Sequence, residues 1–247
     1  MTQYVYGKNV VKQILSDSDR AKVIYLSSRD AKIEEMAKKR HVPVKMVDRK
    51  TMEKMAKSDH HQGVLAEIEP YRTYSIDEII NAKPEGKHGL LIMLDELEDP
   101  HNLGAILRTA DAAGADGVIF KKNNAVGLTP TVAKVSAGAI DTVKCAAVTN
   151  LSRTCEDLKK KGWWIIGADM DGTDYRGLSY DMDVVLIIGN EGKGISRLLE
   201  KQCDYIVSLP MVGKISSLNA SVSAGILMYQ IYNMRFPLQE GGYGKRK

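Results

Sequence analysis

A run of five apolar residues leads directly into a glycine-rich loop in the stretch Val184-Val-Leu-Ile-Ile-Gly-Asn-Glu-Gly-Lys-Gly-Ile-Ser196. Apolar residues at every position, rather than at alternate ones, are typical of a strand buried on both faces of a parallel sheet. Glycines after such a strand let the backbone approach a ligand closely. Because ligands bind beyond the carboxyl ends of the strands in such sheets, the stretch predicts an α/β domain with a ligand loop.

Segments on either side extend this pattern. Residues 90–94 (LLIML) are continuously apolar, and residues 117–120 and 163–167 are shorter or looser runs of the same kind. The segments 102–114, 150–161 and 216–234 have the apolar spacing of helices. This alternation predicts an α/β fold with a mainly parallel sheet over residues 89–247.

The glycine loop matches neither of the two common phosphate-binding fingerprints. Gly189, Gly192 and Gly194 lack the G-x-G-x-x-G spacing of dinucleotide-binding folds, and Ile195 stands where a phosphate loop has lysine. The loop alone therefore indicates a ligand of unspecified kind, or a tight turn without a ligand. Glu191 is interpreted either as a clamp on backbone groups or as a functional carboxylate.

A second candidate segment follows the strand at residues 90–94 and includes Asn102 and Arg108. Asn102 is expected to cap the helix that begins there, at the positive end of the helix dipole. Arg108 lies on the same helix among apolar residues, and a partly buried guanidinium needs a carboxylate or a phosphate beside it. A surface arginine is the alternative interpretation.

A third candidate segment follows a short strand at residue 206 and reads Leu209-Pro-Met-Val-Gly-Lys-Ile-Ser-Ser-Leu-Asn-Ala-Ser221. Serines at the start of a helix are usually caps. Ser217 and Asn219 flank the apolar Leu218, and we interpret the three residues as part of a pocket wall.

Residues 1–70 are predicted to form a separate small α/β unit. Strands are expected at 22–27, 42–47 and 63–69, with a helix capped by Asp30 and another over 49–57. Residues 71–88 are mostly polar, contain Pro84 and Gly86, and are predicted to be a linker with one weak helix at 76–82. Residues 1–85 hold 16 Lys/Arg against 13 Asp/Glu, whereas the whole chain of 247 residues holds 35 against 31, so the N-terminal part carries most of the net positive charge.

The composition excludes several classes of protein. Hydrophobic residues make up 44% of the chain and charged residues 27%, as in an ordinary globular protein. No apolar run has the roughly 18 residues that a membrane span needs, and the N-terminus lacks the pattern of a secretory signal. The three cysteines form no CxxC pair, which argues against a disulfide framework and against a zinc site. We therefore expect a cytoplasmic protein without a metal.

Together the three candidate segments resemble the motifs of the SpoU/TrmH branch of the SPOUT RNA methyltransferases. The motif N-L-G-x-x-x-R occurs at 102–108, G-N-E-G-x-G-I-S at 189–196, and L-P-M-x-G-x-x-S-S-L-N-x-S at 209–221, in the family's order. The N-terminal unit is similar to the small ribosomal-protein-like RNA-binding domain of many members. The strongest similarity is to the subgroup that methylates a guanosine ribose in large-subunit ribosomal RNA, with transfer RNA as the alternative substrate.

The resemblance implies that the protein is an S-adenosylmethionine-dependent RNA ribose 2′-O-methyltransferase. It also implies a homodimer whose C-terminal domain contains a trefoil knot. The residues that it implies for cofactor binding are Gly189, Asn190, Leu209, Met211 and Leu218. The residues that match the family's functional polar positions are Asn102, Arg108, Glu191, Ser217 and Asn219.

The expected role of Arg108 is electrostatic. A guanidinium stays protonated and is a poor base, so we expect Arg108 to bind an RNA phosphate and to lower the pKa of the ribose hydroxyl. His101 is the alternative base. Two functions of other classes are a nicotinamide-dependent oxidoreductase, which the missing G-x-G-x-x-G argues against, and a non-catalytic RNA-binding adaptor, which the intact polar set argues against.

Overall fold

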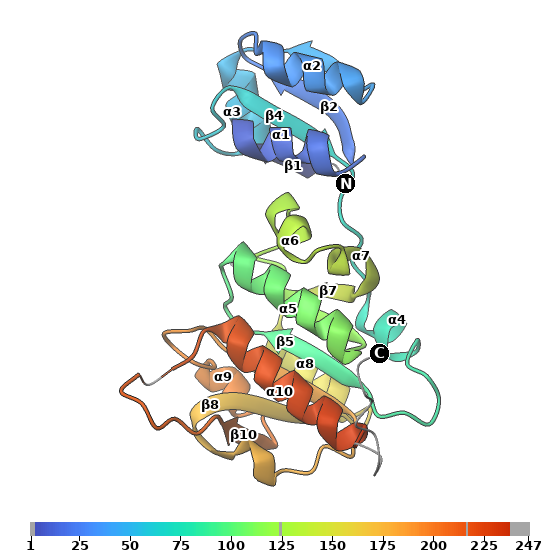
Figure 1. Cartoon of the computed structure of the whole chain (residues 1–247), viewed down its shortest axis with the longest axis vertical. Coiled ribbons are helices and arrows are strands. Elements are labelled where there is room, and N and C mark those ends of the chain that lie inside the picture. The colour runs from blue at the N-terminus through green and yellow to red at the C-terminus, as the bar shows by residue number, and fades with distance from the viewer. Residues whose placement is uncertain (1–2, 124, 216, 238–247) are drawn as a thin grey trace, which may run out of the picture. The chain divides into compact units, whose positions relative to one another are not determined.

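The computed structural model describes residues 3–123, 125–215 and 217–237, and the chain divides into two units, Met1–Arg72 and Thr73–Lys247 (Figure 1). The last ten residues of the domain expected at 89–247 lie outside the described residues. In the part of the chain that is described, no helix has the length and apolar character needed to cross a bilayer.

The first unit is a four-stranded sheet with three helices. Its elements are β1 (Gln3–Tyr6), α1 (Lys8–Asp17), β2 (Ala21–Leu26), α2 (Ala31–Lys39), β3 (Val44–Met46), α3 (Arg49–Ala56) and β4 (Val64–Ile68). The strand order is β1-β4-β2-β3, in which β4 is antiparallel to β1 and β2, and β3 is parallel to β2. Asp30 caps α2 as predicted, accepting a hydrogen bond from the backbone N–H of Ile33.

The sequence analysis assigned no element before residue 22, and thus missed β1 and α1. The helical spacing was present, because Val11, Ile14 and Leu15 are buried on one side of α1. β1 is only four residues long and is held by pairing with β4, about 60 positions away in the chain, which no local pattern predicts.

The second unit contains the parallel sheet that the apolar runs predicted. Its elements are α4 (Ile76–Ile80), β5 (Leu90–Leu94), α5 (Pro100–Ala113), β6 (Gly117–Lys121), α6 (Pro130–Val135), α7 (Ala139–Thr142), β7 (Lys144–Val148), α8 (Leu151–Lys159), β8 (Trp164–Asp174), η1 (Tyr175–Gly177), β9 (Val184–Ile188), α9 (Arg197–Glu200), β10 (Tyr205–Ser208) and α10 (Ala220–Arg235). The order is β10-β8-β9-β5-β6-β7, and every neighbouring pair is parallel. The predicted mainly parallel α/β fold is confirmed.

Helices cover both faces of this sheet. Leu91, Met93, Val185 and Ile187 pack in one buried cluster with apolar residues of α4, α8 and α9. Helices α5 and α10 pack against each other on the other face (Figure 1). Because alternate residues of a strand point to opposite faces, both sides of β5 and β9 are buried, which explains their continuously apolar sequence.

Much of the segment expected to be a linker belongs to the second unit. Ser75 and Glu78 form a capping box at the start of α4. Ile79 is buried in the same cluster as Leu91, and the side chains of Tyr74, Ile76 and Ile80 pack against that cluster. Four apolar side chains in a mostly polar segment are a weak sequence signal, and only packing against the sheet shows what they do.

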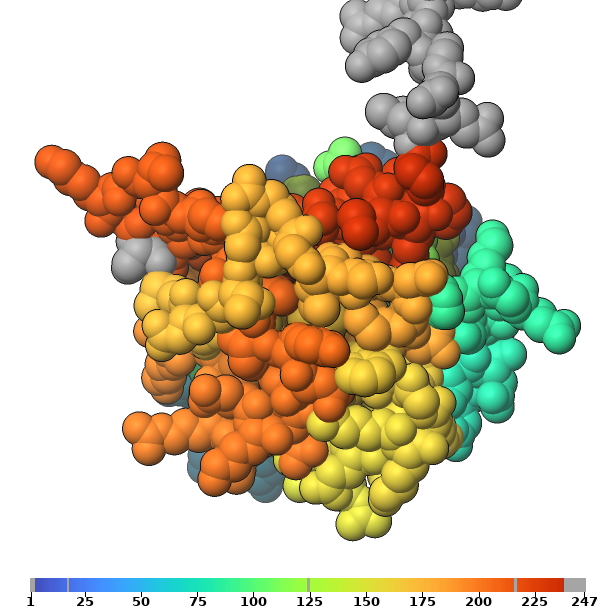
Figure 2. All heavy atoms as spheres, turned by 90° about the horizontal axis from the view of Figure 1, so that it is seen from below, coloured from blue at the N-terminus to red at the C-terminus, as the bar shows by residue number. Residues whose placement is uncertain are grey.

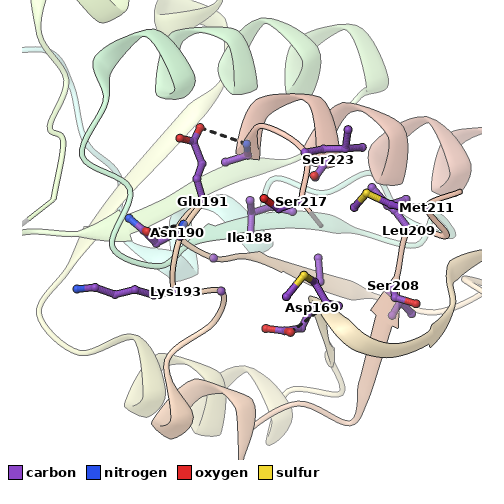
Figure 3. A pocket seen from close by; sticks show the side chains of 18 of the residues that line it. Asp169, Ile188, Asn190, Glu191, Lys193, Ser208, Leu209, Met211, Ser217 and Ser223 are labelled. Atoms are coloured by element: carbon purple, nitrogen blue, oxygen red, sulfur yellow. Dashed lines mark hydrogen bonds between the residues drawn. The ribbon is translucent and has the colours of Figure 1, made fainter. Parts of the chain in front are cut away.

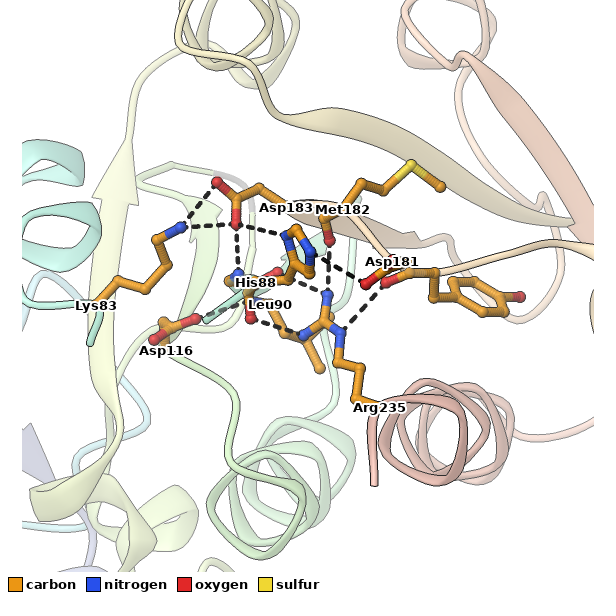
Figure 4. A network of polar contacts seen from close by, with 10 residues as sticks. Lys83, His88, Leu90, Asp116, Asp181, Met182, Asp183 and Arg235 are labelled. Atoms are coloured by element: carbon orange, nitrogen blue, oxygen red, sulfur yellow. Dashed lines mark hydrogen bonds and ion pairs between the residues drawn. The ribbon is translucent and has the colours of Figure 1, made fainter. Parts of the chain in front are cut away.

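The C-terminal end of α10 is hydrogen-bonded to the segments that precede β5 and β9, at the opposite end of these strands from the glycine loop. The Arg235 guanidinium donates hydrogen bonds to the carbonyl oxygens of His88, Gly89, Tyr180 and Met182 over 2.8–3.3 Å (Figure 4). These carbonyls precede β5 and β9, and among them the Gly89 carbonyl also accepts from the backbone N–H of Val184 at 2.9 Å. A single half-buried side chain therefore bonds to four backbone acceptors at the start of two neighbouring strands.

Candidate functional site

The carboxyl ends of β5, β8, β9 and β10 meet at one edge of the parallel sheet, where a cavity of about 610 Å³ opens (Figure 3). Three chain segments form most of its lining, residues 168–170, 188–194 and 207–211. The remainder comes from Ser217, Leu218, Ala220 and Ser223 at the start of α10. All five residues predicted to bind the cofactor line this cavity: Gly189, Asn190, Leu209, Met211 and Leu218.

The glycine loop closes tightly on itself. Asn190 and Gly194 exchange two backbone hydrogen bonds, of 3.0 and 2.9 Å. A Cβ atom on Gly189 would lie 2.3 Å from the carbonyl carbon and oxygen of Gly194, and Gly194 itself has a φ of +67°. Only glycine fits these two positions, so the backbone of the loop forms part of the cavity wall.

The loop after β5 holds the glycine loop in place through one backbone carbonyl and one side chain. The Asn190 amide donates to the carbonyl oxygen of Glu96 at 3.1 Å. The buried Asp95 carboxylate accepts from the backbone N–H of Ser196 at 2.8 Å. The acidic residues after β5 therefore help to fix the ligand loop of the neighbouring strand.

Three of the predicted polar residues meet in one hydrogen-bonded cluster. The Glu191 carboxylate accepts from the side-chain amides of Asn102 and Asn219, each at 2.7 Å. Asn219 also donates to the side-chain oxygen of Asn102 at 3.0 Å. The cluster joins the glycine loop to the N-terminal ends of α5 and α10. The Glu191 carboxylate also accepts from the backbone N–H of Ala220 at 3.4 Å, so it clamps a backbone group as well as side chains beside the cavity.

The predicted cap of α5 was wrong. The cap is Asp99, whose carboxylate accepts from the backbone N–H of His101 at 2.9 Å, and Pro100 occupies the first helical position. Asn102 therefore lies in the first turn with a buried side chain directed to Glu191 and Asn219. Asp-Pro is itself a signal for the start of a helix, and here the helix begins at this pair and not at the asparagine that follows.

At α10, Asn219 is the cap, and its side-chain oxygen accepts from the backbone N–H groups of Ser221 and Val222. Ser217 and Leu218 line the cavity just before the helix. The preceding segment, residues 211–215, projects from the surface of the second unit, shown in orange in Figure 2, and Val212 and Ile215 on it are exposed.

Arg108 differs from the sequence-based expectation. It lies in the middle of α5 with an exposed side chain, and it forms no hydrogen bond or ion pair with any residue that the structure describes. The expectation of a partly buried guanidinium was therefore wrong. The apolar residues beside Arg108 in the sequence face the sheet and α10, while Arg108 faces outward, and its charge is available to an external anion.

Several polar residues of the cavity were not predicted from the sequence to belong to the site, among them Asp169, Lys193, Ser208 and Ser223. Asp169 follows the apolar run at 163–167, so the rule that ligands bind after strand ends could have found it. Among the described residues, no group of three His, Cys, Asp or Glu side chains is arranged to hold a metal ion.

Comparisons with known proteins match both units to families of RNA methyltransferase domains. Residues 89–229 match the SpoU rRNA Methylase family, and residues 4–74 match the family of RNA 2′-O ribose methyltransferase substrate-binding domains. YacO of Bacillus subtilis, whose name places it in the TrmH family of tRNA/rRNA methyltransferases, is 43% identical over 96% of this chain and 98% of its own length. A protein of Staphylococcus aureus with the same family name is 46% identical over 83% of each chain.

Solved structures share the fold. The SpoU methyltransferase AviRb of Streptomyces viridochromogenes, in complex with the cofactor AdoMet, has a TM-score of 0.63 at 23% identity over 95% of this chain and 90% of its own. A TrmH/SpoU tRNA-modifying enzyme of A. aeolicus has a TM-score of 0.56 at 27% identity over 60% of this chain and 76% of its own. The resemblance carried by the three motifs is confirmed, and the chain belongs to the SpoU rRNA methylase family of RNA methyltransferases.

Proposed function

We propose that this protein transfers a methyl group from S-adenosylmethionine to the 2′-hydroxyl of a ribose in RNA. The observation that carries the proposal is that the motif segments 189–196 and 209–221 line one cavity, and that the first motif joins them through the Asn102–Glu191–Asn219 cluster. An oxidoreductase or a non-catalytic adaptor would not need this polar cluster beside the cavity.

The cavity suits S-adenosylmethionine in size and lining. Its volume of about 610 Å³ is within the range of roughly 300–1,000 Å³ for small-ligand sites. Ile188, Val207, Leu209 and Leu218 provide an apolar lining that suits an adenine ring. The glycine loop brings its backbone close to any ligand in the cavity, and polar side chains complete the lining.

The chemistry that S-adenosylmethionine supplies when bound is a methyl group on a positively charged sulfur, so the protein needs no metal for activation. The contribution of the chain is to align the ribose hydroxyl and to assist removal of its proton. The exposed Arg108 guanidinium has no hydrogen-bond or ion-pair partner among the described residues, and it would hold an RNA phosphate in a fixed, two-pronged geometry. The phosphate held by Arg108, or the exposed His101, would receive the proton.

Ribosomal RNA is the substrate that we propose, with a guanosine ribose as the acceptor and transfer RNA as the alternative. The sequence similarity to the ribosomal RNA subgroup supports the first, and the names of the relatives include both classes of RNA. The match of residues 4–74 to substrate-binding domains supports a role for residues 1–70 in RNA affinity, and residues 89–247 would carry the chemistry. Both substrates would place the protein in the cytoplasm.

We further propose a homodimer that packs through α10. Val222, Ile226 and Tyr229 follow one another at helical spacing on its outer side, and each is more than a third exposed. Tyr232 and Phe236 extend the apolar surface with ring centroids 5.0 Å apart. Exposed apolar patches of this kind mark interfaces. The trefoil knot remains a prediction from the family resemblance.

Two measurements test the proposed function. Calorimetry should detect binding of S-adenosylmethionine and S-adenosylhomocysteine, whereas binding of NADH alone would support the oxidoreductase. Mapping of 2′-O-methyl groups in RNA from cells with and without the protein should show one lost site in large-subunit ribosomal RNA. A lost site in transfer RNA would select the alternative substrate, and an unchanged map beside intact RNA binding would support the adaptor.

Sedimentation at micromolar concentration tests the dimer. The wild-type chain should sediment as a dimer, and Tyr229→Asp should sediment as a monomer with an unchanged circular dichroism spectrum. A wild-type monomer at this concentration would contradict the proposal.

A further inference from the structure

An acidic side chain that the family motifs do not include lines the cofactor cavity. Asp169 lies on β8, apart from Glu191 and on the side of the cavity that β8 forms (Figure 3). Its side chain is half-buried, and most of the residues that line the cavity are apolar or glycine. A carboxylate in such surroundings loses hydration, so its position calls for hydrogen-bond donors.

Backbone groups hold the Asp169 carboxylate in a fixed orientation. One oxygen, Oδ1, accepts from the backbone N–H of Met170 at 2.7 Å, and Oδ2 accepts from that of Ile195 at 3.3 Å. Gly194 makes room for the carboxylate, because a Cβ atom on Gly194 would lie 2.6 Å from Oδ2. The carboxylate is thus fastened to the same loop that forms the wall of the cavity.

The two carboxylate oxygens keep capacity to accept further hydrogen bonds. Each has a second lone pair beyond its backbone partner. In the portion of the chain that the structure describes, no lysine or arginine forms an ion pair with Asp169, although Lys193 lines the same cavity. Two fixed acceptors, side by side and facing a cavity, match two hydroxyl donors on adjacent atoms.

We propose that Asp169 is a cofactor-positioning residue that binds the vicinal 2′,3′-hydroxyls of the cofactor's own ribose. The proposal rests on the proposed function, because it takes S-adenosylmethionine as the ligand of the cavity. Holding this ribose on the β8 side fixes the nucleoside half of the ligand and leaves the Glu191 side for the acceptor RNA. The ammonium group of the cofactor is the competing partner for a carboxylate, and the choice of ligands below separates the two.

The test is calorimetry on the full chain with three ligands. S-adenosylhomocysteine has both the diol and the ammonium, 5′-methylthioadenosine has only the diol, and 5′-methylthio-2′,3′-dideoxyadenosine has neither. The variant is Asp169→Asn, which keeps the shape, removes the charge and replaces one of the two acceptor oxygens with an NH2 group. The matched control is Asp171→Asn, which removes the same charge from an exposed position two residues along β8, outside the cavity lining. Circular dichroism and thermal unfolding verify the fold of each.

We expect Asp169→Asn to weaken binding of S-adenosylhomocysteine and of 5′-methylthioadenosine by a similar factor, about tenfold or more, the scale of lost hydrogen bonds to a charged group. The dideoxy analogue should bind the variant and the wild type equally, a result that a merely structural role would not produce. Asp171→Asn should bind all ligands as the wild type does.

Three results would overturn the proposal. Weaker binding of S-adenosylhomocysteine alone would assign Asp169 to the ammonium group. Equal weakening of all three ligands would make Asp169 a support of the loop, and unchanged binding would leave it no role in the site. If the wild-type chain bound none of the ligands, the cofactor assignment itself would fall, and this proposal with it.

Discussion

Replacing Glu191 with alanine removes the acceptor at the centre of the polar cluster. The Asn102 amide then loses a hydrogen bond of 2.7 Å to a charged oxygen, and Asn102 is only 5% exposed, so water has little access to replace it. A buried donor left without a partner costs about 1–3 kcal/mol. The Asn219 amide loses its own bond of 2.7 Å but keeps the one to Asn102, and it is exposed to water.

The expected loss for Glu191→Ala is therefore about 2 kcal/mol in the free energy of unfolding, mostly from Asn102. For a unit of this size, that corresponds to about 4–8 °C in Tm. Thermal unfolding followed by circular dichroism measures it. Methylation should fall as well, because Asn102 and Asn219 lose the group that orients them.

Glu191→Gln separates geometry from charge. The glutamine oxygen can still accept from both asparagine amides, so we expect a loss below about 1 kcal/mol in stability. Glu200→Ala on α9, an exposed glutamate without a role in the site, is the control for removing a carboxylate. An unfolding midpoint of Glu191→Ala equal to that of the control would refute the reasoning, because it would show that the Asn102 amide does not depend on Glu191.

Three further predictions concern Arg108, Arg235 and the thiol of Cys145. Arg108→Ala should lower the methylation rate about 10²-fold or more at saturating cofactor and leave cofactor affinity unchanged. If Arg108→Ala keeps a near-normal rate and His101→Ala is inactive, the histidine is the base instead. Arg235→Ala should lower the free energy of unfolding by about 3 kcal/mol because four backbone carbonyls each lose a hydrogen bond and, of these, Gly89 keeps a backbone donor in Val184. Arg235→Lys should restore little because an ammonium cannot span the four carbonyls. Denaturant melts that leave both variants at the wild-type midpoint would contradict this. Burial raises the pKa of the Cys145 thiol to about 12. Iodoacetamide at pH 8 should therefore alkylate Cys145 only in the unfolded protein, as measured by mass spectrometry. Rapid labelling of the native chain would contradict the buried position of the thiol.

The elements that the sequence predicted correctly are those whose signal is local. The runs at residues 90–94 and 184–188 are apolar at every position because both of their faces are covered, and this pattern is visible without knowledge of their partners. The cap at Asp30 depends on a backbone N–H three residues away. The three motifs were likewise readable, since each is a short stretch that follows a strand.

The tertiary structure decided how those stretches combine. Asn102 has the local features of a cap, yet it bonds to Glu191, 89 positions along the chain, because the strand order places the ends of β5 and β9 side by side. The same order brings Asp169 to Gly194. Arg108 is exposed because it lies on the side of α5 that faces away from the sheet. The neighbouring residues in the sequence alone did not show which side of the helix faces the sheet. Hydrogen bonds and burial depend on distances between segments, and a local pattern contains information only about the few residues that one turn or one strand brings together.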